Sequence, residues 1–420
     1  MDGRKRFLQV VFDLGILMLL LPPSTACAEE AEASLFPASP LSAQLAAYVT
    51  NVQDPSTGLP ESFTQTRDHR LERVAFTYDV ATSALILAHA GKMKQAKQAL
   101  STFVRMPLPS AREFHFNTAY LIDQRRPALE ARSHAGPILW IAIALMRYGE
   151  ASGDRAAVKK GIALLDWAHT SLRHIDGGIV MSHQDNAWNY LMSVEHNWVY
   201  YAALRMATRR LPEGPQRQRL AQDQRAVRRW LGAHLTERGL SDPEQALDVY
   251  THALLVGPES HLDDGAFATA EALASWARGH ITALERQFQV PGSALYDYTD
   301  AKGARDAGRP RTGWLEGTEQ VSVAYQTWAP WFERHGDAAL ARALRMKAAL
   351  AHAEVLRYAA RQSVGGMAVP NTNAAMAIHT FSDGWYARPR SEPALNGTTW
   401  TYFSEVSYNP LTADLPRRAR

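Results

Sequence analysis

Four acidic residues in this sequence stand in the first turn of an expected helix, and they are the residues best suited to acid–base chemistry. They are Asp79, Glu195, Asp248 and Glu316. A single carboxylate at such a position is explained by helix capping and by the helix dipole. Four carboxylates that converge at one end of one domain repel one another and destabilise the fold. A ligand or a reaction that requires them would explain why they are present. We therefore expect all four to be catalytic candidates.

Aromatic and polar side chains accompany the same helix starts or the loops before them. Flat aromatic faces pack against the C–H groups of sugar rings, while carboxylates, imidazoles and amides bond to hydroxyl groups. The candidates for substrate contacts are Tyr78, Asp185, Trp188, His196, Asn197, Trp314, Trp385 and Tyr386. For Trp140 and Trp400, packing in the core is the better explanation. This combination predicts a carbohydrate-binding cleft.

The elements that would position these residues are helical hairpins. The expected pairs cover 76–90 with 92–105, 136–151 with 155–173, 194–210 with 216–235, 246–256 with 265–287, and 315–334 with 338–360, and a last helix covers 394–405. The first helix of each pair is nearly all apolar, and the second is amphipathic. A helix that is apolar all round is buried, whereas an amphipathic helix keeps one face in water. Each hairpin therefore supplies one inner and one outer helix.

The repeat length sets the number of hairpins. The turn glycines Gly91, Gly153 and Gly336 are 62 and then 183 residues apart, and 183 is three times 61. A period of this size divides the chain into about six repeats. We expect one all-α domain over residues 29–420, an (α/α)6 barrel, in which the helix at 41–50 completes the last hairpin. An open solenoid would expose apolar inner helices at its two ends.

The N-terminus and the overall composition indicate a compartment and exclude some partners. Residues 1–28 combine basic residues, a short apolar run and a small-residue cleavage pattern, which predicts a signal peptide and a periplasmic or extracellular protein. The only cysteine, Cys27, makes a lipid anchor the less favoured alternative. With 45 basic and 42 acidic residues, the chain is too balanced to suggest nucleic acid. No cofactor and no metal site are indicated, and the sequence does not indicate an oligomeric state.

Short motifs along most of the chain carry a resemblance to a known family. They are Asp54-Pro55-Ser56-Thr57-Gly58-Leu59-Pro60, Phe76-Thr77-Tyr78-Asp79, Gly136-Pro137, Asp176-Gly177-Gly178-Ile179, Ser193-Val194-Glu195-His196-Asn197, Leu247-Asp248, Leu315-Glu316-Gly317-Thr318-Glu319-Gln320, Gly397-Thr398-Thr399-Trp400 and Asn409-Pro410. In their order and spacing the chain resembles the six-hairpin glycosidase superfamily, and most closely its secreted bacterial members of unassigned activity. The resemblance implies the (α/α)6 fold and a carbohydrate-active role. The sequence departs from it at His252, because a tryptophan is expected soon after Asp248.

The resemblance also implies a mechanism, since glycosidases of this fold mostly invert. Glycoside hydrolysis needs one protonated and one ionised carboxyl group. We expect Glu195 to be the acid and Glu316 the base, with Asp79 and Asp248 holding hydroxyl groups or replacing one of the pair.

Three other functions fit the same residues. A polysaccharide lyase would use His196, Asn197, Tyr200 or Tyr201, with Arg125-Arg126 holding an acidic sugar. A sugar epimerase or isomerase would use paired histidines. A non-catalytic polysaccharide-binding or assembly protein could share the fold.

The segment 367–400 has no helical period but is rich in asparagine, aspartate and aromatic residues. Long connections of this kind in compact domains are usually functional. We expect Trp385 or Tyr386 to form a sugar platform at the rim of the cleft.

Overall fold

The computed structural model describes residues 39–109, 115–129, 132–183, 191–236, 239–240, 246–380 and 386–413. The chain divides into two units, residues 1–33 and 34–420, and all described residues belong to the second. The predicted signal peptide at 1–28 lies outside the described residues. Within the described part, none of the helices has the length and apolar character needed to cross a membrane.

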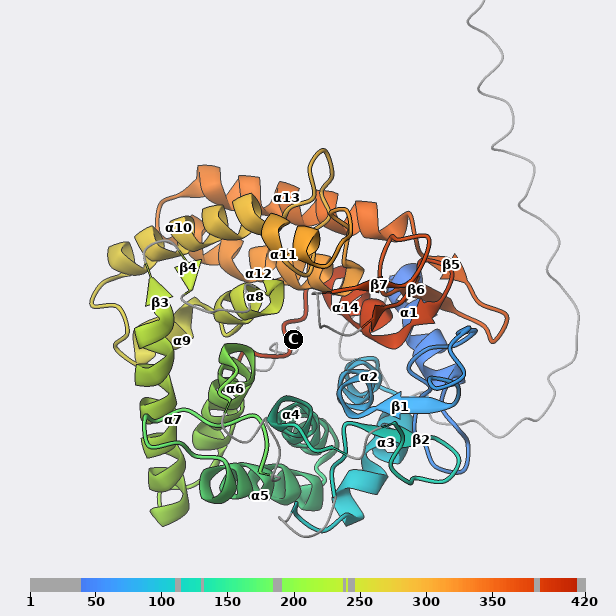
Figure 1. Ribbon diagram of the computed structural model, residues 1–420. Helices are drawn as coiled ribbons and strands as arrows, with labels where there is room; N and C mark the ends of the chain where they lie inside the picture. Colours follow the sequence, from blue (N-terminus) through green and yellow to red (C-terminus); the bar gives the residue numbers. More distant parts are fainter. Residues whose placement is uncertain are drawn as a thin grey trace, which may run out of the picture. The chain divides into compact units, whose positions relative to one another are not determined.

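Six helices of this unit form an inner ring (Figure 1). They are α2 (Thr77–His89), α4 (Ala135–Ser152), α6 (Val194–Arg210), α8 (Leu247–Leu255), α12 (Leu315–Arg334) and α14 (Leu395–Glu405). Each packs against the next, and α14 packs against α2, so the ring closes. Most of their residues are buried, as expected for helices that are apolar all round. This closure confirms the predicted barrel and excludes the open solenoid.

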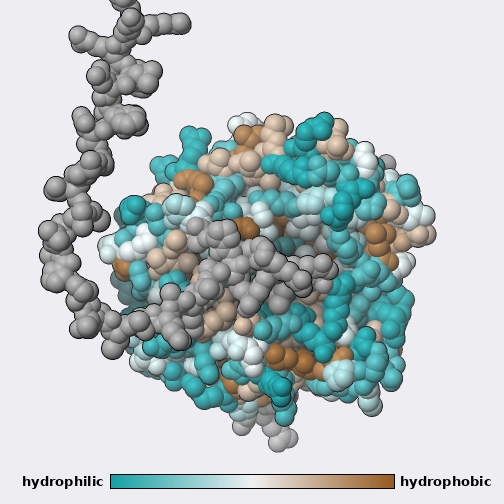
Figure 2. Space-filling view, turned by 180° about the vertical axis from the view of Figure 1, so that it is seen from behind, coloured by the Kyte–Doolittle hydropathy of each residue, from teal (hydrophilic) through white to brown (hydrophobic). Residues whose placement is uncertain are grey.

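Six more helices lie outside this ring and pack against it. They are α1 (Pro40–Asn51), α3 (Met93–Arg105), α5 (Arg155–Ser171), α7 (Pro215–His234), α10 (Ala270–Phe288) and α13 (Ala338–Leu356). Helix α1 packs on α14 and so completes the sixth hairpin, as the sequence predicted. The view from behind the ring shows a mainly hydrophilic face with separate hydrophobic patches (Figure 2). The amphipathic outer helices therefore separate the apolar inner ring from water.

Short elements occupy the connections. Two are the helices α9 (Pro258–Asp263) and α11 (Ala301–Asp306). The strands are β1 (Val74–Phe76), β2 (Ala119–Leu121), β3 (Leu235–Thr236), β4 (Gly239–Leu240), β5 (Ala360–Arg361), β6 (Met367–Pro370), β7 (Ile378–His379), β8 (Tyr386–Ala387) and β9 (Pro393–Ala394). They pair antiparallel as β1–β2, β3–β4, β5–β6–β9 and β7–β8. Strand β1 leads directly into α2 and β9 into α14, so the strands set where inner helices begin.

The starts of the inner helices are locked to one another by backbone hydrogen bonds. In five of the six inner helices, the first residue donates its N–H to a carbonyl in the loop that precedes the next inner helix. The pairs are Thr77 to Thr118, Ala135 to Met181, Leu247 to Tyr298, Leu315 to Asn371 and Leu395 to Ser62. The last pair returns to the loop before α2, so these five bonds cover every junction of the ring except that between α6 and α8. It satisfies N–H groups that a helix leaves unpaired, and it holds the acidic first turns in place.

The C-terminal segment packs against the opposite ends of the inner helices. The Asn409 amide donates to the carbonyl oxygen of Leu255 at 2.7 Å and to the hydroxyl of Thr327 at 3.0 Å. The Arg147 guanidinium donates to the carbonyl of Thr412, and the Tyr408 ring lies 4.9 Å from the ring of His89. The Asn409-Pro410 motif therefore serves the fold at the end remote from the carboxylates.

Candidate active site

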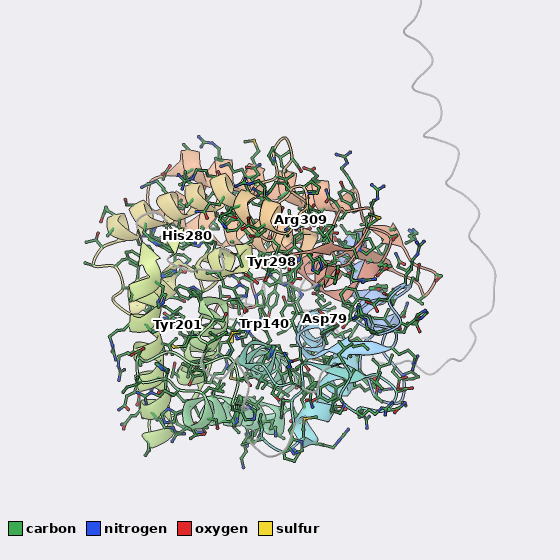
Figure 3. The ribbon with its side chains drawn as sticks, in the orientation of Figure 1. Asp79, Trp140, Tyr201, His280, Tyr298 and Arg309 are labelled. Carbon is green, nitrogen blue, oxygen red and sulfur yellow. The ribbon has the colours of Figure 1, made fainter. Side chains whose placement is uncertain are left out.

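A cavity of about 250 Å³ lies at the N-terminal ends of the inner helices. It is lined by Tyr78, His134, Gly136, Pro137, Trp140, Glu195, His196, Asp248, His252, Tyr298, Trp314, Glu316, Gln320 and Asn396. Three of the four predicted catalytic acids are among them. Figure 3 labels Trp140 and Tyr298, which come from separate elements near the middle of the ring.

Glu316 is the most deeply buried acid of this cavity, with only 4% of its surface exposed. The Tyr78 hydroxyl donates a 2.8 Å hydrogen bond to its Oε1, and the Trp400 indole N–H donates to the Tyr78 oxygen at 2.6 Å. Burial raises the pKa of Glu316 to about 8; the negative charges of Asp79 and Asp248 act in the same direction, and the bond from Tyr78 opposes them. Glu316 is therefore mostly protonated at neutral pH and can give up a proton.

Asp79 lines a different, neighbouring cavity of about 650 Å³. Burial raises the pKa of Asp79 to about 7, although a hydrogen bond with Ser62 partly counters this. Tyr78 and Asn396 line both cavities, so the two adjoin. Asp79 thus stands beside the smaller cavity and not in its wall.

Glu195 lies between two imidazoles. Its Oε2 is 3.3 Å from Nε2 of His196, and its Oε1 is 3.7 Å from Nε2 of His252. The other nitrogen of His252, Nδ1, donates to the backbone carbonyl of Asp248 at 2.6 Å. Nε2 of a neutral His252 is therefore a proton acceptor that faces the carboxyl group.

Burial keeps both imidazoles uncharged near neutral pH. It lowers the pKa of His196 to about 3, with further contributions from His134 and His252, and it lowers the pKa of His252 to about 4. Two neutral rings that flank a carboxyl group can pass a proton to or from it. Among the residues that the structure describes, no group of three potential ligands is placed to hold a metal ion.

The residues predicted to contact the substrate lie in different places in the structure. Tyr78, His196 and Trp314 line the smaller cavity, and the half-exposed Tyr386 lines the larger one. Asp185, Trp188 and Trp385 lie outside the described residues.

Asn197 does not fit its predicted role in substrate binding. Its side chain is fully buried, and its amide pairs with the backbone of Ile179 in both directions, at 2.8 and 3.0 Å. A third bond joins it to the carbonyl of Ser193 at 2.8 Å. With both ends of the amide engaged, Asn197 fixes the start of α6 and thereby positions Glu195.

The cavity also contains residues that were not among the predicted site residues. They are His134, His252, Tyr298, Gln320 and Asn396, besides Trp140, for which core packing was expected. The sequence spacing could have indicated two of them. His252 follows Asp248 by one helical turn, and Gln320 follows Glu316 by one turn, so each lies on the same helix face as the acid before it. Tyr298 comes from the connection after α10, and no helical pattern could have placed it.

Comparisons with known proteins agree with this architecture. No protein family and no curated protein matches the sequence. Among solved structures, a cellobiose 2-epimerase from Bacillus thermoamylovorans is similar with a TM-score of 0.60 at 10% identity, over 86% of this chain and 95% of the other. A D-mannose isomerase is similar with a TM-score of 0.60 at 10% identity, over 88% and 96%. A glycosidase variant in complex with glucose has a TM-score of 0.58 at 12% identity, over 87% and 95%. The chain therefore has an (α/α)6 barrel fold, as predicted from its sequence.

Proposed function

We propose that this protein is a glycoside hydrolase in which Glu316 is the general acid and Glu195 the general base. The observation that carries the proposal is the burial of Glu316, which keeps this carboxyl group protonated at neutral pH in a cavity shared with Glu195 and Asp248. Glu316 would protonate the glycosidic oxygen as its bond to the anomeric carbon breaks. Glu195 would remove a proton from the water that attacks that carbon from the opposite face, which inverts its configuration.

This assignment reverses the roles expected from the sequence. Glu195 is the better base because its side chain is 20% exposed and flanked by two imidazoles. The attacking water needs access to such a carboxylate, and the exposed part of the Glu195 side chain provides it. Asp248 remains as a third acid for binding hydroxyl groups.

The lining of the cavity favours an uncharged sugar. None of its described lining residues is a lysine or an arginine, while three are acids. A uronic acid would meet carboxylates there without a cation to pair with. The volume of about 250 Å³ lies below the usual range for drug-sized ligands and suits a single sugar ring.

Three of the residues suggested for a lyase have other partners. Tyr200 donates to Asp223 at 3.3 Å, Tyr201 donates to the Ser260 carbonyl at 2.9 Å, and Arg125 donates to the Ser56 carbonyl at 3.0 Å. These contacts favour a structural role for all three.

A second candidate is a sugar epimerase or isomerase. Three imidazoles, those of His134, His196 and His252, line the cavity, and neutral imidazoles can exchange a proton at a carbon next to a carbonyl group. Two of the similar structures are an epimerase and an isomerase, which adds support from the fold alone.

The product distinguishes the two candidates. Purified protein is incubated with neutral oligosaccharides in H₂¹⁸O, and the products are identified by mass. A hydrolase yields shorter sugars that carry one ¹⁸O at the new reducing end. An epimerase or isomerase leaves the chain length unchanged and, in D₂O, incorporates deuterium beside the carbonyl carbon. That second pattern would replace the hydrolase proposal.

Glu316→Gln and Glu195→Gln should each lower kcat/KM by about 100-fold or more, the usual contribution of a positioned acid or base. The matched control is Glu271→Gln, which makes the same change on the exposed face of α10 and should leave the rate unchanged. Full activity in both cavity variants would refute the assignment.

Export is a separate proposal that rests on residues 1–28 alone. Fractionation of cells that express the full chain, with N-terminal sequencing of the product, tests it. Protein retained in the cytoplasm with an intact N-terminus would refute it.

A further inference from the structure

A second large cavity, of about 1090 Å³, lies between the outer helices α7 and α10. Its wall includes Arg225, Arg228 and Arg229 from α7, Asp264 and Phe267 from the loop after α9, and Trp276 from α10. None of its lining residues lines the catalytic cavity. It is therefore a separate site on the outer ring.

Arg228 is a buried cation that forms no ion pair with any residue that the structure describes. It is 4% exposed, and its Nη2 donates at 3.1 Å to Nδ1 of His261. His261 is a neutral acceptor, because burial holds its pKa well below the usual range. Among the described residues, the Nε and Nη1 atoms of Arg228 have no hydrogen-bond partner. A buried guanidinium with unused donors is costly to maintain, so an anion beside it would stabilise the fold.

Two further arginines add to the positive charge. Arg225 and Arg229 are exposed and stand one helical turn apart, where like charges repel. Within the described part of the chain, neither forms an ion pair, unlike Arg217 with Glu213 and Arg219 with Asp166 on the same helix. Among the described residues of the wall, Asp264 is the one acid, and it is already bonded by Tyr201, Gln224 and Arg205. The cavity thus keeps a net positive charge.

Aromatic side chains make the opposite part of the wall. Trp276 is partly exposed, and its ring lies 5.3 Å from that of Phe267. The indole Nε1 of Trp276 has no hydrogen-bond partner. A ring face beside free N–H donors suits a ligand that has both an apolar face and polar substituents.

We propose that this cavity is a binding site for an acidic saccharide, with Arg225, Arg228 and Arg229 holding its carboxylate or sulfate groups and Trp276 contacting a sugar ring. The ligand class differs from that of the catalytic cavity, whose described lining residues include three acids and no lysine or arginine. The site would bind acidic sugar units of a polysaccharide that also contains neutral units, or those of a neighbouring polysaccharide chain. The bound units would lie at a distance from the glycosidic bond that reacts.

The test measures the binding of acidic saccharides by titration calorimetry. The full chain carries Glu316→Gln to block turnover, so the result does not depend on the proposed reaction. The probes are hexagalacturonate and a heparin hexasaccharide, with cellohexaose as the uncharged control. Arg225→Gln with Arg229→Gln should weaken acidic-probe binding by about 10-fold or more, because hydrogen bonds to charged groups contribute strongly. The control pair Arg217→Gln with Arg219→Gln removes the same charge from the same helix and should change affinity less than about 2-fold, as expected for screened surface charges.

Several results would overturn the proposal. They are failure of both acidic probes to bind, equal loss of affinity in the two arginine pairs, or equal binding of cellohexaose. Inorganic sulfate that binds as tightly as the saccharides would reduce the site to a simple anion site and refute the role of Trp276.

Discussion

At the scale of single residues, the hydrogen bonds that link Trp400, Tyr78 and Glu316 influence the protonation state of the proposed acid. Trp400 donates to the Tyr78 oxygen, and Tyr78 donates to Glu316. The bond from Tyr78 lowers the pKa of Glu316, while burial raises it to about 8. An acid must be protonated to act, so hydrolysis should decline as the pH rises through about 8.

Tyr78→Phe tests this link. Loss of the hydrogen bond removes stabilisation of the charged carboxylate, so the pKa of Glu316 rises and the basic limb of the kcat/KM profile moves upward by about one pH unit. Phe is the matched change, because it removes only the hydroxyl group. A profile that does not move, or that moves to lower pH, would contradict the assignment of Glu316 as the acid.

At the scale of elements, the contact between α4 and α6 controls where Glu195 stands. A Cβ atom on Gly136 would lie 2.5 Å from Nε2 of His196, and His196 is the nearest imidazole to Glu195. Only glycine allows this approach, since real Cβ contacts are never so short. The Gly136-Pro137 motif therefore has a steric reason in this fold.

Gly136→Ala should displace the His196 ring and lower kcat by about 10-fold or more, because small misplacements of catalytic groups are costly. The control is Gly214→Ala, where an added Cβ meets nothing within 4 Å. Circular dichroism and melting curves confirm that the variant is folded. Unchanged kcat in folded Gly136→Ala would show that the position of His196 does not matter.

At the scale of the whole barrel unit, a partly buried ion cluster joins the helices α12, α13 and α14. His352 on α13 contacts Glu319 on α12 at 2.9 Å and Glu405 on α14 at 3.0 Å. The Ser39 hydroxyl before α1 donates to Glu405 at 2.5 Å. Three helices therefore meet at one imidazole, and the start of α1 joins them through Glu405.

This cluster makes stability depend on pH. Burial alone would lower the pKa of His352, but its bonds to Glu319 and Glu405 outweigh burial and raise it. The folded chain then binds the proton more tightly than the unfolded chain. The stabilisation is complete below the unfolded pKa of about 6.5 and is lost as the pH rises through the higher folded value.

His352→Gln should therefore destabilise the protein by about 1.5–3 kcal/mol at pH 6 and by less at pH 9. Urea unfolding at the two pH values measures the difference. His69→Gln is the control, because His69 pairs with Glu72 on the surface, where ion pairs contribute little. An equal loss at both pH values would contradict a charged His352.

Much of this fold was determined by the sequence itself. The alternation of apolar and amphipathic helices, with glycines at the turns, predicted the helix bounds to within a few residues, and α1 closed the last hairpin as expected. These features are local, since a helix that is apolar on all sides must be buried wherever the chain places it. The same reasoning brought Glu195, Asp248 and Glu316 to one cavity, because helix starts that face one way converge.

Only the tertiary structure decided which of these acids share a cavity and how each is protonated. Asp79 is the third residue of its helix, whereas Glu195, Asp248 and Glu316 are each the second residue of theirs, and Asp79 lines the neighbouring cavity. The imidazoles beside Glu195 come from different inner helices, and Tyr298 comes from a connection. Depth of burial and neighbours distant in sequence set the pKa of a carboxyl group, and spacing along the chain determines neither.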